Sequence, residues 1–420
     1  MSNATYDVVL YGATGYTGKF AAQYLASHPQ QPKIAFAGRN EAKIRGVMEQ
    51  LTNVSAERVQ SIGVIQATSE DIESLKRMAR STKVIINMVG PYAKYGGYDV
   101  AKAAAEAGIG YVDLTGESSL YKRVADDLHS LAKSTKAVIV PSSGFDSLPF
   151  DLTTYLAVQE LRKTTGGKAD VDYALCGYHI HGSMSGGTIA SAVTEAKVAD
   201  LGFTNAYQLG PTRGTQKAEV VRSRYLPQFK RYGAYTLFTS HNTGIVNRSW
   251  GLLQEAHDEH GYGSSFKYIE GYVTGSYIGA WLVSCMMMLF AYLLRHHAWF
   301  GEMITKKVPQ GTGASMEQQL QGFGNIRTLA VARDGHTKAL ATFRVKGDPG
   351  YLKTAAFISE MGLTLALEKS RLSPLAQAGG VLTSATAGGE VLAERLSRYS
   401  EVHILTKDVS TSTDVSQECL

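Results

Sequence analysis

The residues best suited to chemistry in this sequence are three glycines, Gly12, Gly15 and Gly18, which lie three apart near the start of the chain. A run of β-forming residues precedes them and a segment with helical spacing follows, which predicts a strand, a tight turn and a helix N-terminus. Such a turn presents backbone N–H groups and the positive end of a helix dipole to a phosphate. The residues predicted to bind the phosphates of a dinucleotide are Gly12, Ala13, Thr14, Gly15, Tyr16, Thr17 and Gly18. A glycine-rich hairpin is the alternative, and the helical spacing after Gly18 disfavours it.

The residues after the second predicted strand indicate which dinucleotide binds. A carboxylate at this position binds the ribose 2′-hydroxyl of NADH, whereas an arginine favours the 2′-phosphate of NADPH. Here Arg39 and Asn40 follow the strand Lys33–Ala37, and the first acidic residue is Glu41. We therefore predict NADPH over NADH. The alternative is that Arg39 is a solvated loop charge.

The order of the predicted elements defines the fold class. Strands and helices alternate at short spacing as far as Val140, which is typical of a doubly wound parallel sheet of the Rossmann type. Beyond Pro149 the alternation stops, and the stretch 326–345 predicts a β-hairpin. The fold class is thus α/β, with a dinucleotide-binding domain (1–150), an α+β substrate or dimerisation domain that holds an antiparallel sheet (151–350), and a C-terminal helical region that packs back on the first domain (351–420).

Other residues follow predicted strands at the carboxyl edge of the parallel sheet. Val89, Gly90 and Pro91 come after the fourth strand, and we predict that they lie near the nicotinamide ribose. Glu117 and Asp146 follow the fifth and sixth strands, and we interpret them as residues that start or cap helices.

Composition and cysteine usage exclude several classes of protein. A net charge of +5 on 420 residues does not indicate a nucleic-acid partner. The cysteines Cys176, Cys285 and Cys419 show neither metal-ligand spacing nor a disulfide framework, so we predict no metal site and a reducing compartment. Because the first strand is predicted to begin within a few residues of Met1, we expect no signal peptide and an intracellular protein.

One stretch, residues 271–294, carries no charge and is long enough for a membrane helix. A single span would separate the predicted hairpin at 326–345 from the nucleotide-binding domain. Attachment to one face of a membrane or lipid droplet, on the cytosolic side, avoids that conflict and is the favoured interpretation. A buried helix or a contact between two copies of the chain comes second, and a single span comes third.

An ordered set of short blocks resembles a known family. Besides the glycine-rich loop, these blocks are Ala37–Asn40, Asn87–Tyr92, Tyr95–Gly97, Tyr111–Glu117, Ser143–Pro149, Ser185–Thr188, Gly347–Tyr351, Gly379–Thr383 and Ala385–Ala387. Together they resemble the saccharopine dehydrogenase-like oxidoreductases, and within them the group that includes the trans-acting enoyl reductases of lipid and polyketide assembly. The resemblance spans nearly the whole chain and implies a pyridine-nucleotide fold followed by a substrate domain. The apolar stretch 271–294 departs from saccharopine dehydrogenases that act on free amino acids, which favours a lipidic substrate.

Reduction of a double bond conjugated to a carbonyl needs a hydride at the β-carbon, a donor near the enolate oxygen and a proton for the α-carbon. Tyr92 and Tyr95 are the predicted donors from the first domain, and His181 is the predicted donor from the second. The predicted function is NADPH-dependent reduction of an enoyl C=C bond in a lipid or polyketide-like substrate at a membrane surface. Two alternatives stay open, namely a saccharopine-type dehydrogenase that acts on a C=N imine and a membrane adaptor that binds nucleotide without turnover. A homodimer is also left open.

Overall fold

The computed structural model describes residues 4–167, 170–183, 185–198, 206–214, 219–309 and 311–412. Within residues 185–198, side chains are described only as far as Ala196. Cys419 therefore lies outside the described residues, as does the end of the predicted C-terminal region. Of the other two cysteines, Cys176 is buried and Cys285 is half-buried, and both are free thiols.

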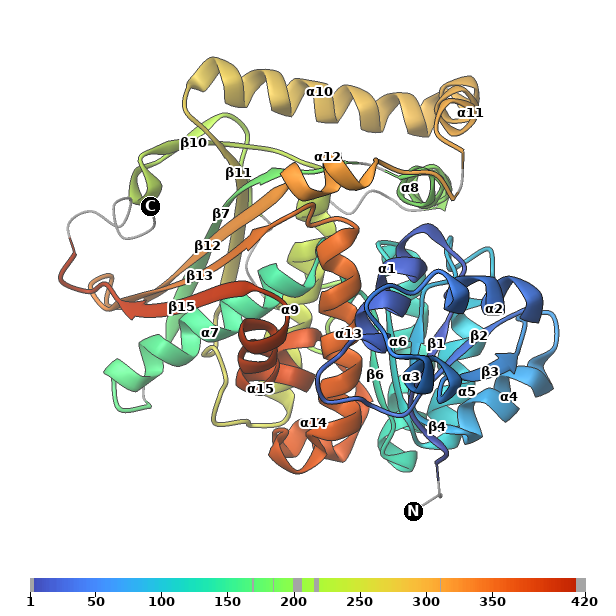
Figure 1. The fold of residues 1–420 in the computed structure, drawn as a ribbon. Helices are drawn as coiled ribbons and strands as arrows, with labels where there is room; N and C mark the ends of the chain where they lie inside the picture. Colours follow the sequence, from blue (N-terminus) through green and yellow to red (C-terminus); the bar gives the residue numbers. More distant parts are fainter. Residues whose placement is uncertain are drawn as a thin grey trace.

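The N-terminal part forms a seven-stranded sheet flanked by helices (Figure 1). Its elements are the strands β1 (Tyr6–Tyr11), β2 (Ile34–Gly38), β3 (Gly63–Gln66), β4 (Thr82–Asn87), β5 (Gly110–Asp113) and β6 (Val138–Val140), and the helices α1 (Tyr16–Ala26), α2 (Glu41–Glu49), α3 (Ala56–Gln60), α4 (Ile72–Arg80), α5 (Gly97–Ala107) and α6 (Ser118–Thr135). All strand pairs are parallel, in the order β14-β6-β5-β4-β1-β2-β3. Because the order reverses next to β1, this is the predicted doubly wound Rossmann arrangement, and the prediction is confirmed.

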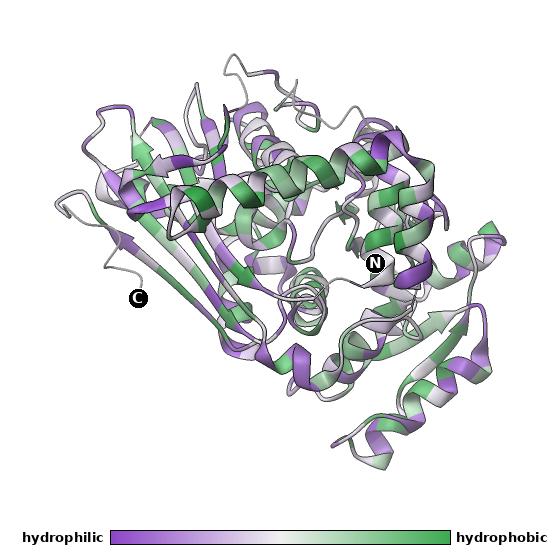
Figure 2. Cartoon of the chain, turned by 90° about the horizontal axis from the view of Figure 1, so that it is seen from above, coloured by the Kyte–Doolittle hydropathy of each residue, from purple (hydrophilic) through white to green (hydrophobic). Residues whose placement is uncertain are grey.

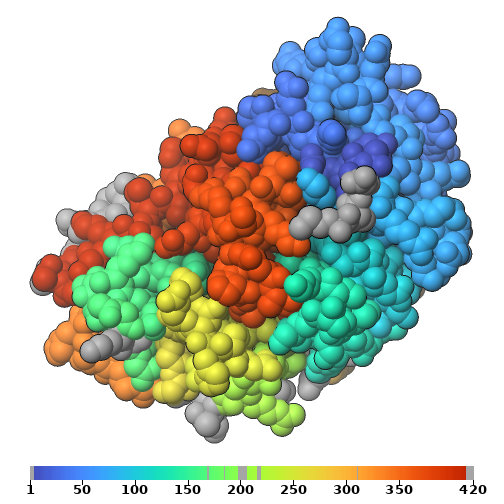
Figure 3. Space-filling view, turned by 90° about the horizontal axis from the view of Figure 1, so that it is seen from below, coloured from blue at the N-terminus to red at the C-terminus, as the bar shows by residue number. Residues whose placement is uncertain are grey.

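The seventh strand of this sheet comes from the far end of the chain. The C-terminal part contains α13 (Leu352–Leu367), α14 (Pro374–Ala378), β14 (Gly380–Val381), α15 (Ser384–Tyr399) and β15 (Val402–Asp408). β14 pairs with β6, and α13 packs against α1, β1, β4 and β5. Seen from below, the C-terminal segment (orange and red) lies between the N-terminal part (blue) and the middle of the chain (Figure 3). The region predicted as helical thus also supplies a strand to each sheet.

The middle of the chain builds a second, eight-stranded sheet. Its elements are α7 (Leu148–Thr164), β7 (Val171–His181), α8 (Gly186–Val198), β8 (Glu219–Val220), β9 (Arg224–Leu226), β10 (Arg231–Ala234), α9 (Phe238–Glu255), β11 (Lys267–Thr274), α10 (Tyr277–His296), α11 (Ala298–Lys307), α12 (Met316–Gln321), β12 (Phe323–Ala332) and β13 (Lys338–Lys346). The predicted hairpin is present as β12–β13. The predicted antiparallel pairing is thus found within a mixed sheet, because β11 runs parallel to both β7 and β8.

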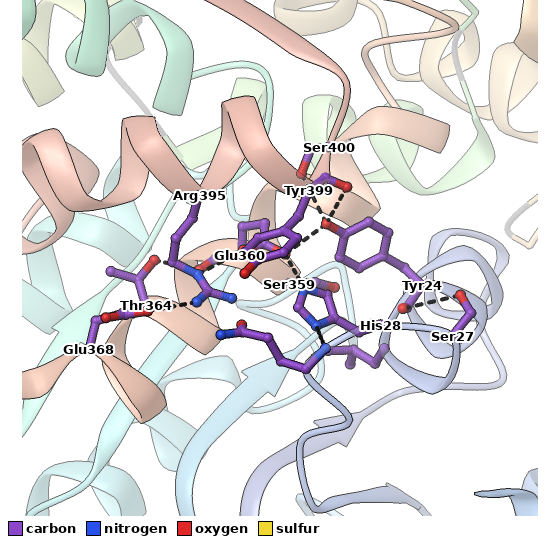
Figure 4. A network of polar contacts seen from close by, with 12 residues as sticks. Tyr24, Ser27, His28, Ser359, Glu360, Thr364, Glu368, Arg395, Tyr399 and Ser400 are labelled. Carbon is purple, nitrogen blue, oxygen red and sulfur yellow. Dashed lines mark hydrogen bonds and ion pairs between the residues drawn. The ribbon is translucent and has the colours of Figure 1, made fainter.

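A buried ionic network holds the C-terminal helices to the first helix (Figure 4). Glu360 on α13 is fully buried and accepts hydrogen bonds from Tyr24 at 2.7 Å and from the Arg395 Nε at 2.8 Å. Its Oε1 also lies 2.9 Å from the His28 Nε2, and Arg395 donates a second bond to Glu368 at 2.9 Å. The charge of Glu360 therefore joins three segments that are far apart in the sequence.

The apolar stretch predicted at 271–294 divides into two elements. Residues 271–274 belong to β11, and the helix α10 runs from Tyr277 to His296. Ser276 separates them, because its side chain accepts a hydrogen bond from the Gly279 N–H at 3.1 Å and so caps the helix. α10 is long and apolar enough to cross a membrane, yet only 17% of its apolar window is buried. The alternative of a buried core helix is therefore wrong.

Candidate active site

The glycine-rich loop has the shape that a dinucleotide phosphate requires. Gly12 has φ of +99°, a conformation in which residues with a side chain are strained. A Cβ on Gly18 would lie 2.1 Å from the carbonyl oxygen of Gly12, so only glycine lets α1 start this close to β1. Gly15 precedes the helix without any side-chain cap, which leaves the first N–H groups of α1 free to bind an anion. The residues present therefore fit a bound dinucleotide.

The two residues after β2 have different surroundings. The side chain of Asn40 accepts a hydrogen bond from the Lys43 N–H at 2.9 Å and caps α2. The oxygen of its side-chain amide is thus used by the protein, and its place among the residues predicted to bind cofactor stays a prediction. Arg39 is exposed at the carboxyl end of β2, on the opposite side of β1 from β4. In a Rossmann sheet this is where the adenosine ribose lies.

Replacing Arg39 with aspartate is expected to weaken the binding of NADPH by about tenfold or more, since the carboxylate repels a 2′-phosphate. Binding of NADH should be unchanged or improved. Fluorescence titration of both nucleotides into the wild type and R39D measures this. Arg45→Asp on the exposed face of α2 is a control for charge alone. If R39D keeps the NADPH affinity of the wild type, Arg39 does not select the cofactor.

A cavity of about 810 Å³ lies between the two sheets and begins at the glycine-rich loop. Its walls come from the start of α1, the loops after β4, β5 and β6, the region from β7 to α8, and α10. Of the residues predicted to bind cofactor, Gly15, Tyr16, Thr17, Gly18 and Gly90 line it. The others are Gly12, Ala13, Thr14, Arg39, Asn40, Val89 and Pro91, and they are not among the described lining residues.

The loop after β4 is held by a buried carboxylate. Glu117, which is fully buried, accepts hydrogen bonds from the Tyr92 N–H at 2.9 Å, the Ala93 N–H at 2.8 Å and the Ser191 hydroxyl at 3.0 Å. Ser191 is on α8, so Glu117 connects the nucleotide fold to the second domain. The interpretation of Glu117 as only a helix-start residue is therefore too narrow, because it shapes one wall of the cavity.

Tyr92 is placed as a structural residue. Its hydroxyl donates to the Asn87 carbonyl at 3.2 Å and accepts from the Leu114 N–H at 3.1 Å. Burial, with a smaller contribution from the charge of Asp113, raises the pKa of the hydroxyl well above its usual value. The prediction of Tyr92 as a proton donor conflicts with this geometry, because both hydrogen bonds go to the backbone and the hydroxyl resists ionisation.

The other two predicted donors lie in different places. Tyr95 is half-buried near Lys94, whose ammonium is 5.2 Å from the ring centroid, and it is not among the described lining residues of the cavity. His181 does line the cavity, although it is exposed. Its ring stacks on Phe323 with 6.0 Å between centroids. The structure therefore brings His181 to the site and leaves Tyr95 outside it.

Asp146, like Glu195, carries a carboxylate, lines the cavity and was not predicted as a site residue. It follows β6 and lines the cavity, and within the described residues its carboxyl group makes no hydrogen bond or ion pair. Ser147 takes the cap position of α7, so Asp146 does not cap that helix. Burial raises the pKa of Asp146 to about 6. Its place at the carboxyl edge of the sheet was the signal that could have identified it.

Two hydroxyls lie on the wall of the cavity formed by the second domain. Tyr351 accepts a hydrogen bond from the Ser185 N–H and shares one with the Thr188 hydroxyl at 2.7 Å. Asp348 fixes the same loop by accepting from the Ser183 N–H at 2.7 Å and the Gly350 N–H at 2.8 Å. The blocks Ser185–Thr188 and Gly347–Tyr351 are thus brought together to present hydroxyls to the cavity.

His241, on α9, is a neutral part of the wall. Burial lowers its pKa to about 4. The Ser142 hydroxyl donates to the Thr115 carbonyl at 2.6 Å and so accepts from the His241 Nε2 at 3.1 Å. The Nδ1 then accepts from the Ser118 hydroxyl at 2.8 Å. Both ring nitrogens are used, which assigns His241 a positioning role.

The far wall of the cavity is apolar. Met287, Phe290, Ala291 and Leu294 of α10 line it. Charged lining residues are few, and within the described part of the chain no arginine is among them. The same described residues contain no group of three or more metal-ligating side chains that could hold an ion.

Comparisons with known proteins agree with this arrangement. The model of the saccharopine dehydrogenase NADP binding domain matches residues 8–140. The chain is 34% identical over 415 residues to trans-acting enoyl reductase Rv2449c of Mycobacterium tuberculosis, covering 93% of this chain and 95% of that protein. It is 31% identical over 418 residues to the trans-acting enoyl reductase of Mycobacterium leprae, with the same coverage. The fold is similar to saccharopine dehydrogenase (L-Glu forming) from Saccharomyces cerevisiae, with a TM-score of 0.52, 13% identity, and coverage of 96% of this chain and 99% of that one.

Proposed function

We propose that this chain, which belongs to the saccharopine dehydrogenase-like oxidoreductases and within them to the trans-acting enoyl reductase group, uses NADPH to reduce an enoyl C=C bond in an apolar acyl substrate. The family resemblance predicted from the sequence blocks is confirmed. The chain is an NAD(P)-dependent oxidoreductase. The choice of NADPH, the enoyl group and the apolar substrate are the parts that we propose.

The main support for the proposal is that one continuous cavity is lined by both the glycine-rich loop and α10. At one end it is lined by Gly15–Gly18 and at the other by the apolar side chains of α10. The phosphate-binding turn and an apolar substrate site therefore share a single cavity. An amino-acid substrate would need cationic partners for its carboxylates, and the scarcity of lining cations disfavours that alternative.

NADPH held at the glycine-rich loop, Gly12–Gly18, would supply a hydride to the β-carbon of the substrate. As that bond forms, the electrons of the double bond move toward the carbonyl oxygen, which needs a hydrogen-bond donor. The Thr188 and Tyr351 hydroxyls on the cavity wall share one hydrogen bond, so the hydroxyl that accepts it keeps its own proton to donate to this oxygen. The protonated carboxyl of Asp146 gives its proton to the α-carbon, and the resulting carboxylate is reprotonated from water. Glu117 and His241 keep the loops around these groups in position.

The test is a binding and turnover experiment on the full-length protein in detergent. We expect NADPH fluorescence to report binding that is tighter than that of NADH. Addition of an α,β-unsaturated acyl thioester should then oxidise NADPH, with the saturated acyl thioester as the product. The saturated thioester itself is the control and should leave NADPH unchanged. Binding without turnover of enoyl or imine substrates would favour the adaptor alternative, and turnover of imines alone would favour the saccharopine-type reaction.

A further inference from the structure

We propose that α10 and α11 form a roof over the cavity and lie on the surface of a lipid bilayer. An acyl chain then passes from the bilayer, beside α10, into the cavity. The inference rests on the proposed function for the identity of the substrate. Its docking part rests on the exposed and packed faces of α10 and on the exposed side chains of α11. The roof is defined here as residues 277–307.

The outer face of the roof is an exposed apolar stripe. Ile278, Leu282, Met286 and Leu289 follow one another at three- or four-residue spacing and are 55–68% exposed. In the view from above, hydrophobic residues recur along the length of α10 (Figure 2). The stripe continues with large aromatic and sulfur-containing side chains that are also exposed, namely Trp281, Tyr292, Trp299 and Met303. Aromatic rings of this kind favour the boundary between lipid and water.

The inner face of α10 packs against the rest of the protein. Ala280, Ser284 and Leu294 are buried, and the Ser284 hydroxyl accepts a hydrogen bond from the Tyr235 N–H at 2.9 Å. Met287 and Ala291 lie on this side and line the cavity. Because α10 makes 3.6 residues per turn, these positions are opposite the outer stripe. One helix therefore separates the cavity from the surroundings.

The exposed outer face and the packed inner face of α10 determine how the roof can bind a bilayer. A membrane-spanning helix would be surrounded by lipid or by other spanning helices, whereas α10 packs on α8, β10 and β11. Only its outer face is available, so the helix lies in the plane of the interface. The end of the roof carries Arg295, Lys306 and Lys307 against the single acid Glu302, all of them exposed. This balance favours an anionic lipid surface.

The position of the roof gives an apolar substrate a short path. A helix with its side chains is about 10 Å across, so an acyl chain in the outer layer of the bilayer is that far from the cavity. The chain would pass beside α10 without crossing bulk water. Met287, Phe290, Ala291 and Leu294 then receive it as the wall of the cavity.

The docking test uses a matched pair of triple variants. I278E/L282E/L289E places three charges on the outer face of the roof, and I72E/L320E/L405E places three charges at exposed apolar residues elsewhere. In flotation with phosphatidylcholine vesicles, with or without phosphatidylserine, the wild type and the second variant should bind, more strongly when phosphatidylserine is present. The roof variant should bind at least about tenfold more weakly, since three apolar side chains are lost from the contact. Equal binding of all three proteins would overturn the proposal.

A second measurement separates docking from passage of the substrate. Ala291→Trp fills the cavity from the inner face and should abolish enoyl turnover while NADPH binding and vesicle binding stay as in the wild type. The roof variant should lose turnover of an enoyl lipid in vesicles by about tenfold and keep turnover of the same lipid in detergent micelles. Equal losses in vesicles and micelles would overturn the passage of substrate along the roof.

The outcomes also distinguish this proposal from the proposed function. If the wild type binds vesicles but reduces no enoyl substrate in either medium, the proposed function fails and docking stands. If it reduces the substrate in micelles but does not bind vesicles, the roof proposal fails and the function stands. If the roof variant turns a dimer into a monomer in sedimentation without lipid, the outer face is a contact between two copies, which overturns the bilayer as its occupant.

Discussion

Replacing Asp146 with asparagine is expected to lower kcat for the proposed reduction by about 10²-fold or more, because the amide has no acidic proton to give to the α-carbon. Affinity for NADPH should be unchanged, since Asp146 is not part of the glycine-rich loop that is expected to bind the phosphates of the cofactor. The control is Glu195→Gln. Glu195 also lines the cavity, but its carboxylate accepts hydrogen bonds from the Ser119 N–H at 3.0 Å and the Ser119 hydroxyl at 2.7 Å.

The pH dependence gives this prediction a second readout. The pKa of Asp146 is raised to about 6 by burial, so the protonated acid predominates below that pH and is lost above it. In the wild type, kcat should therefore fall about tenfold per pH unit above pH 6, which is the slope for loss of one proton. This limb should vanish in D146N and persist in E195Q. A wild-type rate that is flat from pH 5 to pH 8 would contradict the assignment of Asp146.

Replacing Glu360 with glutamine is expected to lower the free energy of unfolding by about 3 kcal/mol. The substitution keeps the shape of the side chain but removes the charge that faces Arg395, whose side chain is 2% exposed. The buried Arg395 cation would then keep only Glu368 as a charged partner, and this loss is costly because the surroundings cannot solvate the remaining charge. Urea unfolding followed by circular dichroism measures the change as a lower midpoint at an unchanged slope.

The control for this experiment is an ion pair at the surface. Glu394 is 2.5 Å from Arg371, and both side chains are 47% exposed. Glu394→Gln should change the free energy of unfolding by less than about 1 kcal/mol, since water replaces the lost partner. Equal effects of the two substitutions would show that the network around Glu360 adds no more than a surface pair.

Local patterns in the sequence predicted the elements that depend on neighbouring residues. The glycine spacing at Gly12–Gly18 fixes a turn whose strand and helix are adjacent in the chain, and the β-α alternation requires parallel pairing. The hairpin β12–β13 was predictable for the same reason, because Gly335 adopts φ of +73° in the turn between the strands.

Features that depend on distant pairing were not predictable in this way. Nothing in Gly380 or Val381 indicates that they pair with Val138 and Ile139. The parallel pairing of β7 with β11 likewise joins segments far apart in the sequence. The apolar stretch 271–294 contains the end of the buried strand β11 and most of the surface helix α10. Composition alone does not distinguish these two elements.

The site itself was predictable at the level of the loop and less so at the level of single side chains. The phosphate-binding turn is recognised by the spacing of its glycines, whereas a proton donor is recognised by the groups that surround its side chain in the fold. Tyr92 and Asp146 both follow strands at the same edge and both line the cavity, yet the hydroxyl of Tyr92 is bonded to the backbone, whereas burial raises the pKa of Asp146. That difference arises from tertiary packing.

The strand β14 has a consequence for how the protein is made. At about 5–20 residues per second, translation delivers Gly380 on the order of ten seconds or more after its partner Val138. Until then β6 is an open edge of the nascent nucleotide-binding sheet, and the face that α13 covers is exposed to solvent. The nucleotide-binding sheet therefore cannot be completed before Gly380 and Val381 have been synthesised.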